Sequence, residues 1–254
     1  MEPSDKKIEL IRPEILNYAG SIQAWFTCKN AEFGAKNQTV PGLNFGFNTN
    51  EQKEIVEQHR EELLSALNID AEKIAYAEQV HGNKIKVVTK GGIYKGVDAL
   101  LTKTPGLALA IQVADCAAIL LADSERGVIA AVHAGWRGAA GNILPNTLKK
   151  MKSVGAQASN LRAFISPCIS QAHFEVGAEV AEKFPAEFVD YQNYSKPHVD
   201  LKSILNRQLL EQGLKKENIE VHEGCTVDNS KQFYSYRREQ QQSGRMLGLI
   251  RLDN

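Results

Sequence analysis

The chain has 254 residues and carries 30 basic and 30 acidic side chains, so its formal net charge is zero. Hydrophobic residues make up 43% of it, which supplies enough apolar material for a core and excludes an intrinsically disordered chain. The balanced charge argues against a nucleic-acid-binding protein, because no excess of cations exists to neutralise phosphates.

The chain shows no internal repeat, low-complexity tract or linker, so we expect a single domain over residues 1–254. Its N-terminal segment lacks the apolar core of a secretory signal. Its most apolar stretch, residues 107–121, is too short for a membrane span and contains Gln112 and Asp115. The four cysteines are too scattered for a disulfide framework. These features predict a cytoplasmic protein with free thiols and no membrane contact.

The first predicted element is a helix over 51–67, for which Thr49 and Gln52 form a candidate capping box. Five short apolar runs follow and predict buried strands, because Gly, Asp or Ser bounds most of them. A helix over 138–151 comes next, in which Pro145 must produce a kink or mark the start. The five predicted strands cover residues 85–89, 99–102, 107–113, 117–122 and 128–133.

The last third of the chain also contains both predicted strands and predicted helices. Strands are predicted over 161–165, 219–222 and 246–251, and helices over 176–184 and 201–211. Asp200 is the expected N-cap of the second helix. The interspersed elements indicate an α/β or α+β fold. Short turns between the runs from 85 to 133 predict antiparallel neighbours. The chain lacks both GxGxxG and GxxxxGK[ST], so the common nucleotide-binding loops are absent from its sequence.

Polar side chains of metal-ligand type interrupt the apolar runs in three segments. Cys116 and His133 lie at equal distances from the turn predicted around 123–127, so a hairpin places them almost directly opposite each other. Cross-strand partners have Cβ atoms about 4.5–5.5 Å apart. His81 follows another strand-like segment and is the candidate third member. The three segments are EQVHG at 78–82, VADCAA at 113–118 and AVHAGWRG at 131–138.

Two histidines and one cysteine suit an open, catalytic zinc site, in which water occupies the fourth position. The same residues also suit a Cys–His hydrolase, or a core thiol and imidazole without a chemical role, and spacing alone leaves these interpretations open. The turn after His133 carries Gly135, Arg137 and Gly138. Such a turn at a helix start suits an anion, with Arg137 as a bidentate contact, or is an ordinary glycine-rich turn.

Several long motifs resemble the laccase-domain family. This family was first called multi-copper polyphenol oxidase and is better described as zinc-dependent purine nucleoside phosphorylases and adenosine deaminases. The motifs occur in the family's order and span nearly the whole chain. They include QVHGNKI at 79–85, VDALLT at 97–102, QVADCAAILLAD at 112–123, VHAGWRGAAGNIL at 132–144, SPCISQAHFEVG at 166–177 and FYSYRRE at 233–239.

The resemblance implies a zinc site on His81, Cys116 and His133. It implies one domain with mixed central β-sheets flanked by helices, similar to the catalytic domain of cytotoxic necrotizing factor. It also implies phosphorolysis of adenosine, inosine, guanosine and methylthioadenosine, together with deamination of adenosine. Purine nucleosides and phosphate are then the partners. Arg60 matches an arginine of the family pattern by position and, with Arg137, is expected to contact phosphate or substrate.

The catalytic residues expected for these reactions are Asp115, Cys116 and His133. Zinc lowers the pKa of bound water to about 7, and a carboxylate must carry protons during deamination. Asp115 is the nearest candidate, with an orienting hydrogen bond as its alternative role. Neighbours on a regular strand face opposite ways, so Asp115 and Cys116 serve one site only if the strand ends or bulges there.

One departure from the family pattern is the segment SPCISQAHFEVG at 166–177. Relatives tend to have GPCIG followed by a segment with Cys or Tyr, whereas this chain has Ser166, Ser170 and His173. The difference bears on how substrate fits near this loop and leaves the metal-ligand trio unaffected.

Three other functions are weighed against this one. An amide hydrolase that edits peptidoglycan precursors would use Cys116 as nucleophile and His133 as base, or a zinc-activated water. A binding or scaffold protein is disfavoured, because structural zinc normally has four protein ligands. A copper oxidase is disfavoured by ligand supply, since the chain has six histidines, no HxH pair and no methionine beside the trio.

Overall fold

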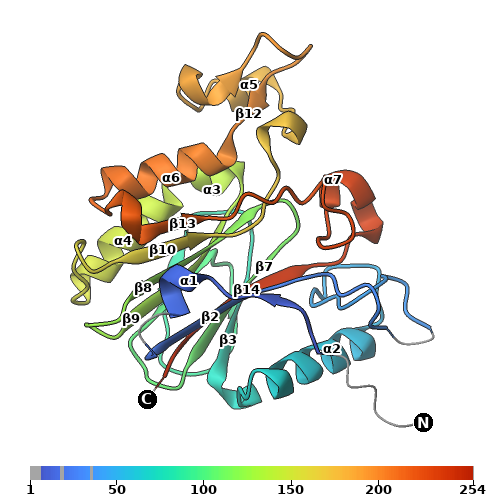
Figure 1. The fold of residues 1–254 in the computed structure, drawn as a ribbon, viewed down its shortest axis with the longest axis vertical. Coiled ribbons are helices and arrows are strands. Elements are labelled where there is room, and N and C mark those ends of the chain that lie inside the picture. The colour runs from blue at the N-terminus through green and yellow to red at the C-terminus, as the bar shows by residue number, and fades with distance from the viewer. Residues whose placement is uncertain (1–6, 18–19, 35–36, 254) are drawn as a thin grey trace.

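In this computed structural model, which describes residues 7–17, 20–34 and 37–253, two six-stranded sheets pack face to face (Figure 1). The first sheet runs in the order β1 (Leu10–Ile11), β2 (Ile22–Thr27), β14 (Met246–Leu252), β7 (Ala108–Val113), β3 (Ile74–Glu78) and β5 (Gly92–Lys95). The second runs in the order β13 (Ile219–Val221), β10 (Arg162–Ile165), β8 (Ala117–Asp123), β9 (Val128–Ala134), β6 (Ala99–Thr102) and β4 (Ile85–Val87). A separate two-stranded ribbon joins β11 (Val189–Asp190) to β12 (His198–Val199).

Helices cover the outer face of each sheet, which gives four layers. Leu63 and Leu64 of α2 (Lys53–Ala66) pack on Trp25 and Leu249 of the first sheet. Three helices, α3 (Trp136–Ala140), α4 (Ile143–Ser153) and α6 (Leu201–Glu211), cover the second sheet. The remaining helical pieces are α1 (Glu14–Asn17), α5 (Ala178–Ala181), α7 (Tyr236–Glu239) and the 3₁₀ turns η1 (Ala71–Lys73), η2 (Gln171–His173), η3 (Ala186–Phe188), η4 (Lys216–Asn218) and η5 (Gln240–Gln242).

The layered arrangement explains the continuous apolar runs. In β8, Ile119 and Leu121 face the helices, whereas Ala118 and Leu120 point between the two sheets. Every residue of β8 and β9 is buried, so neither face of these strands needs polar side chains. The predicted class, a mixed α/β fold with helices flanking mixed sheets, is confirmed, and each of the eight predicted strands overlaps one observed strand, with ends that differ by no more than two residues.

The expectation of antiparallel neighbours between 85 and 133 is wrong in part. The β8–β9 hairpin and the β6–β9 pair are antiparallel, but β4 and β6 are parallel. The successive strands β6, β7 and β8 do not pair, because the chain passes from the second sheet to the first and back again. Short connections of this kind join two sheets as readily as two neighbours in one sheet, and local sequence does not distinguish the two cases.

Among the helix predictions, one N-cap is confirmed and three details are wrong. Asp200 caps α6 as expected and accepts a hydrogen bond from the backbone N–H of Ser203. The Thr49 capping box is wrong, since α2 has no side-chain cap and the Thr49 hydroxyl donates to the carbonyl of Gly46. The segment 138–151 belongs to two helices, because Asn142 has a φ of 57° and Pro145 stands in the first turn of α4. The helix expected over 176–184 is reduced to α5.

Among the described residues, the helices are too short or too polar to cross a membrane.

Candidate metal centre and its cavity

The structure brings His81, Cys116 and His133 together from three separate segments. His81 lies in the loop after β3, Cys116 in the connection between β7 and β8, and His133 on β9. One ligand atom from each lies within 4.8 Å of the other two, and the histidine rings meet edge to face at 4.8 Å between centroids. Such a group could hold a divalent cation.

The register between β8 and β9 differs from the one predicted for this hairpin. His133 pairs with Ala118, and the same register brings Cys116 level with Gly135, not with His133. Cys116 therefore approaches His133 diagonally from just beyond the start of β8. A Cβ atom at position 135 would lie 2.7 Å from the Cys116 Sγ, so the absence of a side chain at Gly135 makes room for the thiol.

A buried aspartate that the sequence analysis did not single out, Asp98, orients both histidines. Its carboxylate lies 2.8 Å from Nδ1 of His133 and accepts backbone N–H groups from Gly82 at 2.8 Å and His81 at 2.9 Å. Occupation of Nδ1 leaves Nε2 of His133 for the Cys116 side. Burial would raise the pKa of Asp98, but its hydrogen bonds to His133 and to backbone N–H groups hold that pKa below the usual value.

The charges of the centre favour a deprotonated sulfur. Burial raises the pKa of the Cys116 thiol, but the charge and hydrogen bond of His133, with a hydrogen bond from His81, lower it to about 6. Burial likewise lowers the pKa of His133, and the Cys116 sulfur and Asp98 together raise it to about 9. At neutral pH these opposite shifts favour a thiolate beside an imidazolium, and a cation that binds here would take the place of the imidazolium proton.

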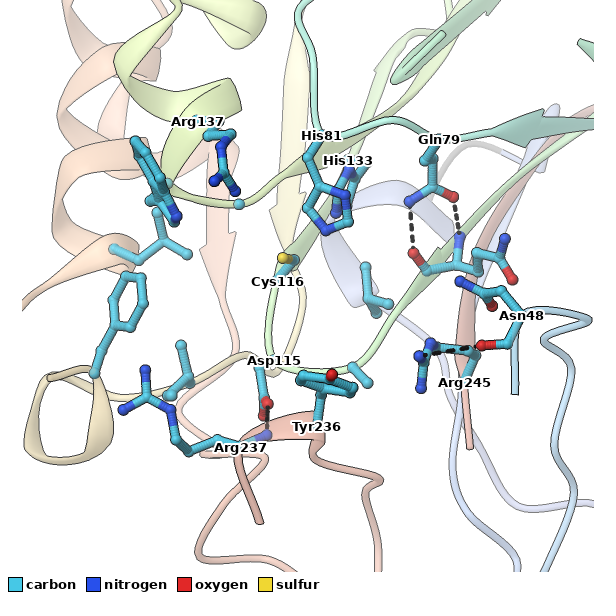
Figure 2. A pocket seen from close by; sticks show the side chains of 18 of the residues that line it. Asn48, Gln79, His81, Asp115, Cys116, His133, Arg137, Tyr236, Arg237 and Arg245 are labelled. Atoms are coloured by element: carbon cyan, nitrogen blue, oxygen red, sulfur yellow. Dashed lines mark hydrogen bonds between the residues drawn. The ribbon is translucent and has the colours of Figure 1, made fainter. Parts of the chain in front are cut away.

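The trio opens into a cavity of about 760 Å³ (Figure 2). Three arginines, Arg137, Arg237 and Arg245, and one carboxylate, Asp115, are the charged side chains among the described residues that line it. Carboxamide and aromatic side chains complete its wall, among them Asn48, Gln79, Gln112, Trp136, Phe174 and Tyr236. The excess of positive charge and the apolar surfaces suit an anion together with a flat, partly apolar molecule.

The three arginines differ in how much of their hydrogen-bonding capacity the protein uses. The Arg237 guanidinium donates to the carbonyls of His173 and Glu175. That of Arg245 donates to the carbonyls of Ser243 and Gly244. Arg137 is exposed, stacks on Trp136 at 4.3 Å and makes no hydrogen bond through its guanidinium within the described part of the chain. Its donors therefore remain available to a ligand.

Arg60 lies outside the described lining of the cavity. Its Nε and Nη2 donate to the carbonyl of Phe45 at 2.9 and 2.7 Å. The rings of Phe47 and Tyr76 each lie 4.3 Å from its guanidinium carbon. Burial lowers the pKa of Arg60 from its ordinary value. In this structure the side chain connects α2 to the loop around Phe45 and has no contact with the trio.

Asp115 stands where the strand geometry is interrupted, as a shared site with Cys116 requires. β7 ends at Val113, β8 begins at Ala117, and Asp115 has a φ of 82°. Its two carboxylate oxygens accept hydrogen bonds from the Thr226 hydroxyl and the backbone N–H of Arg237, both at 2.6 Å. Asp115 thus ties the loop that carries Cys116 to the C-terminal part of the cavity wall.

Sequence reasoning also missed the carboxamides that line the cavity. The side chain of Gln79 bonds to both backbone polar groups of Gln112, at 2.7 and 2.9 Å. The Oε1 atom of Gln112 is buried and has no hydrogen-bond partner in the structure. Gln79 and Gln112 were present in the quoted motifs, but only the folded chain shows that they share a wall with Arg245 (Figure 2).

Comparison with known proteins agrees with the family resemblance that the sequence motifs indicate. The model of the family described as "Multi-copper polyphenol oxidoreductase laccase" matches residues 23–253. A purine nucleoside phosphorylase of Deinococcus radiodurans is 39% identical over 215 residues, 83% of this chain and 82% of that protein. Adenosine deaminase RL5, from an unknown prokaryotic organism, is 28% identical over 93% of this chain and 97% of its own. The crystal structure of hypothetical protein YfiH from Bacillus licheniformis superposes with a TM-score of 0.89 at 26% identity, covering 99% of this chain and 98% of that one.

Proposed function

Because this chain belongs to the multi-copper polyphenol oxidoreductase laccase family, we propose that it is a zinc-dependent purine nucleoside phosphorylase. The reaction transfers the ribosyl group of adenosine, inosine or guanosine from the purine to phosphate, giving the free base and ribose 1-phosphate. Methylthioadenosine would give adenine and 5-methylthioribose 1-phosphate in the same way. The name of the Deinococcus radiodurans relative, a purine nucleoside phosphorylase that is 39% identical over 215 residues, supports this choice. The cavity beside the trio supports it independently.

The donor set of the trio fits zinc. Imidazole nitrogen and thiolate sulfur are the ligands that zinc prefers, and three protein ligands with one open position is the pattern of its catalytic sites. His81, Cys116 and His133 would hold the ion, and Asp98 would keep the ring of His133 in place. When bound, zinc supplies a Lewis acid that polarises oxygen groups and makes coordinated water more acidic. Copper oxidation stays disfavoured, since no methionine is found among the described residues that line the cavity.

Binding of phosphate requires a positively charged side chain, and Arg137 is the candidate for this role. Its guanidinium is exposed in the cavity wall and makes no hydrogen bond within the described residues, whereas those of Arg237 and Arg245 are engaged by backbone carbonyls. A planar guanidinium binds phosphate through two parallel hydrogen bonds. In our proposal Arg137 holds the attacking phosphate, while Arg237 and Arg245 add a positive field.

The nucleoside fits the remaining space. A volume of about 760 Å³ lies within the range of about 300–1,000 Å³ of small-molecule sites. Phe174 and Trp136 offer apolar surface to a purine ring. Gln112 lines the cavity and its buried Oε1 lacks a donor, so in our proposal this carboxamide turns toward the ligand and accepts an N–H group of the base. These contacts orient the nucleoside for attack at its C1′ atom.

We propose adenosine deamination as a second activity of the same site, on the strength of the similarity to adenosine deaminase RL5. Water and adenosine then give inosine and ammonia, and a carboxylate must carry protons. Asp115 is the carboxylate in the cavity wall, but both its oxygens accept hydrogen bonds from Thr226 and Arg237. We therefore propose Asp115 chiefly as a positioning residue, with proton transfer requiring release of one of these bonds.

A peptidoglycan-editing amide hydrolase remains a second candidate because of one geometric feature. Cys116, His133 and Asp98 form a chain of thiol, imidazole and carboxylate, the arrangement of cysteine hydrolases. The sulfur serves either as metal ligand or as free nucleophile, so the two functions compete for Cys116. Metal content together with hydrolysis of a muropeptide precursor distinguishes them.

The observation that carries the proposal is a three-ligand centre open to a cavity in which three arginines face one carboxylate. The test is incubation of the purified protein with inosine, with and without phosphate, and chromatography of the products. We expect hypoxanthine and ribose 1-phosphate only when phosphate is present, and no product from Cys116→Ala. Absence of a phosphate-dependent product in a zinc-loaded sample would refute the assignment.

A further inference from the structure

A second group of metal-ligand side chains lies outside the site described above. His173, Cys225 and Asp228 place one ligand atom each within 4.8 Å of the other two. Nε2 of His173 lies 2.6 Å from Oδ1 of Asp228, and the thiol of Cys225 is 6% exposed. None of the three is among the described residues that line the cavity of the first centre.

The backbone presents two of these side chains from a single turn. Cys225 and Asp228 are three positions apart, and the backbone N–H of Asn229 closes the turn on the carbonyl of Cys225 at 3.0 Å. The side chain of Asn229 accepts the backbone N–H of Cys225 at 3.2 Å. Two ligands separated by two residues is the spacing with which one turn of chain chelates zinc. The turn therefore holds sulfur and carboxylate on one side before any ion arrives.

The environment of the sulfur also suits a metal-bound thiolate. Ser170 donates to Sγ of Cys225 twice, from its hydroxyl at 3.1 Å and from its backbone N–H at 3.4 Å. Outer hydrogen bonds of this kind orient a ligand and stabilise its charge. Ser170 stands at the start of η2 (Gln171–His173), the turn that supplies His173. The same short segment thus provides the third ligand and the support for the sulfur.

We propose that His173, Cys225 and Asp228 form a second binding site for a zinc-type divalent cation. The thiolate sulfur is a soft ligand and the imidazole nitrogen a borderline one, and these two favour zinc over magnesium or calcium, while zinc also accepts a carboxylate oxygen. The ion takes Nε2 of His173 in the tautomer that carries its hydrogen on Nδ1, and it displaces the thiol proton of Cys225, which leaves to solvent. His173 and Asp228 are 36% and 59% exposed at their side chains, which leaves the fourth position to water.

Occupation of this site would join two segments of the cavity wall. The carbonyl of His173 accepts a hydrogen bond from Arg237, and the next residue, Phe174, lines the cavity. On the other side, Thr226 follows Cys225 and donates to Asp115. A cation that links His173 to Cys225 therefore stabilises the cavity from behind its surface.

Titration of the metal-free full-length protein with Co²⁺ tests the proposal, because cobalt bound to a thiolate gives a charge-transfer band in the near ultraviolet. We expect two equivalents with this band in the wild type. Cys225→Ser and Cys116→Ala should each retain one equivalent, and the double variant none. Cys28→Ser, which removes a buried thiol outside both clusters, is the matched control and should retain two.

Asp228→Asn supplies a second readout that does not depend on a cysteine. The amide can still hydrogen-bond to His173 but is a poor ligand, so Co²⁺ affinity of the second site should fall tenfold or more in the Cys116→Ala background. The proposal is overturned if Cys116→Ala shows no thiolate band, if that band survives in the double variant, or if Asp228→Asn leaves the affinity unchanged. In the last case His173 and Asp228 form an ion pair only.

Discussion

At the scale of single residues, the buried carboxylate of Asp98 determines how the trio is presented. It is fully buried, yet it accepts backbone N–H groups from the loop of His81 and bonds to the ring of His133. One side chain thus fixes the position of one histidine and the ring orientation of the other. A group of this kind tunes a metal centre without touching the metal.

Asp98→Asn should therefore weaken zinc binding, by about 10- to 100-fold on the usual effect of losing such a partner. The amide preserves the volume but cannot accept at both positions. Zinc affinity is measured by competition with a chromophoric chelator. Asp123→Asn is the matched control, because Asp123 is equally buried and accepts backbone N–H groups from Arg126 and Gln157, away from the trio. Equal affinities in both variants would contradict this role for Asp98.

Arg137→Gln should raise the KM for phosphate about tenfold or more, because hydrogen bonds to charged groups contribute about 1.5–3 kcal/mol. The KM for inosine should change much less, since the nucleoside is proposed to contact other parts of the wall. Steady-state kinetics with each substrate varied in turn gives both values. Arg207→Gln, an exposed arginine of α6 paired with Glu211, is the control and should alter neither. A rise in both constants would place Arg137 elsewhere in the reaction.

At the scale of elements, the passage of the chain from one sheet to the other creates the centre. β7 belongs to the first sheet and β8 to the second, and Cys116 lies on the connection between them. The connection ends level with Gly135 at the far end of β9, where a missing side chain admits the sulfur. The hairpin and the crossing together bring a thiol and two imidazoles to one end of the sheets.

Gly135→Ala tests this packing directly. The backbone at position 135 has a φ of −88°, which any residue adopts, so the variant changes only the contact between the new methyl group and the Cys116 Sγ at 2.7 Å. We expect displacement of the thiol and loss of most of the bound zinc, measured by metal analysis after dialysis. Gly177→Ala, at the start of α5, is the control, because its φ of −72° also suits any residue and its added Cβ would meet only the side chain of Glu179. Full zinc content in Gly135→Ala would show that the sulfur can relocate.

At the scale of the whole molecule, stability rests on three apolar interfaces between four layers. The middle interface lies between the two sheets and contains residues such as Leu109, Ile111 and Leu120. It supports β7, β8 and β9, the strands whose ends carry Cys116 and His133. The rigidity of the centre is therefore a property of the sheet packing and not of the loops alone.

Leu120→Ala should lower the free energy of unfolding by about 2–5 kcal/mol, the range for truncating a buried leucine. Leu120 is fully buried between the sheets. Leu210→Ala makes the same chemical change on α6, where the side chain is 37% exposed, and should cost far less. Urea denaturation followed by circular dichroism gives both values. Similar losses for the two variants would mean that the sheet interface contributes less than its burial indicates.

The local pattern of residues determined much of what was expected. Apolar runs bounded by Gly, Asp or Ser gave the positions of eight strands, because strands buried on both faces need no polar alternation. The spacing of ligand-type residues singled out His81, Cys116 and His133, which the fold does bring together. The strands β1, β2, β3, β5, β11 and β12 went unrecognised, as did the break at Asn142 that divides one expected helix into two.

Tertiary structure alone decided the register of the β8–β9 hairpin and the division of the strands between two sheets. It also decided which residues surround the trio. Asp98, Gln112 and Arg245 come from distant parts of the chain, so no local spacing reveals that Asp98 bonds to His133 or that Gln112 and Arg245 line the cavity beside the trio. Arg60 shows the converse, since its Nε and Nη2 donate to the carbonyl of Phe45, a contact that its position in the sequence does not disclose. Residue types and periodicity are encoded locally, whereas pairing and burial depend on which surfaces meet when the layers pack.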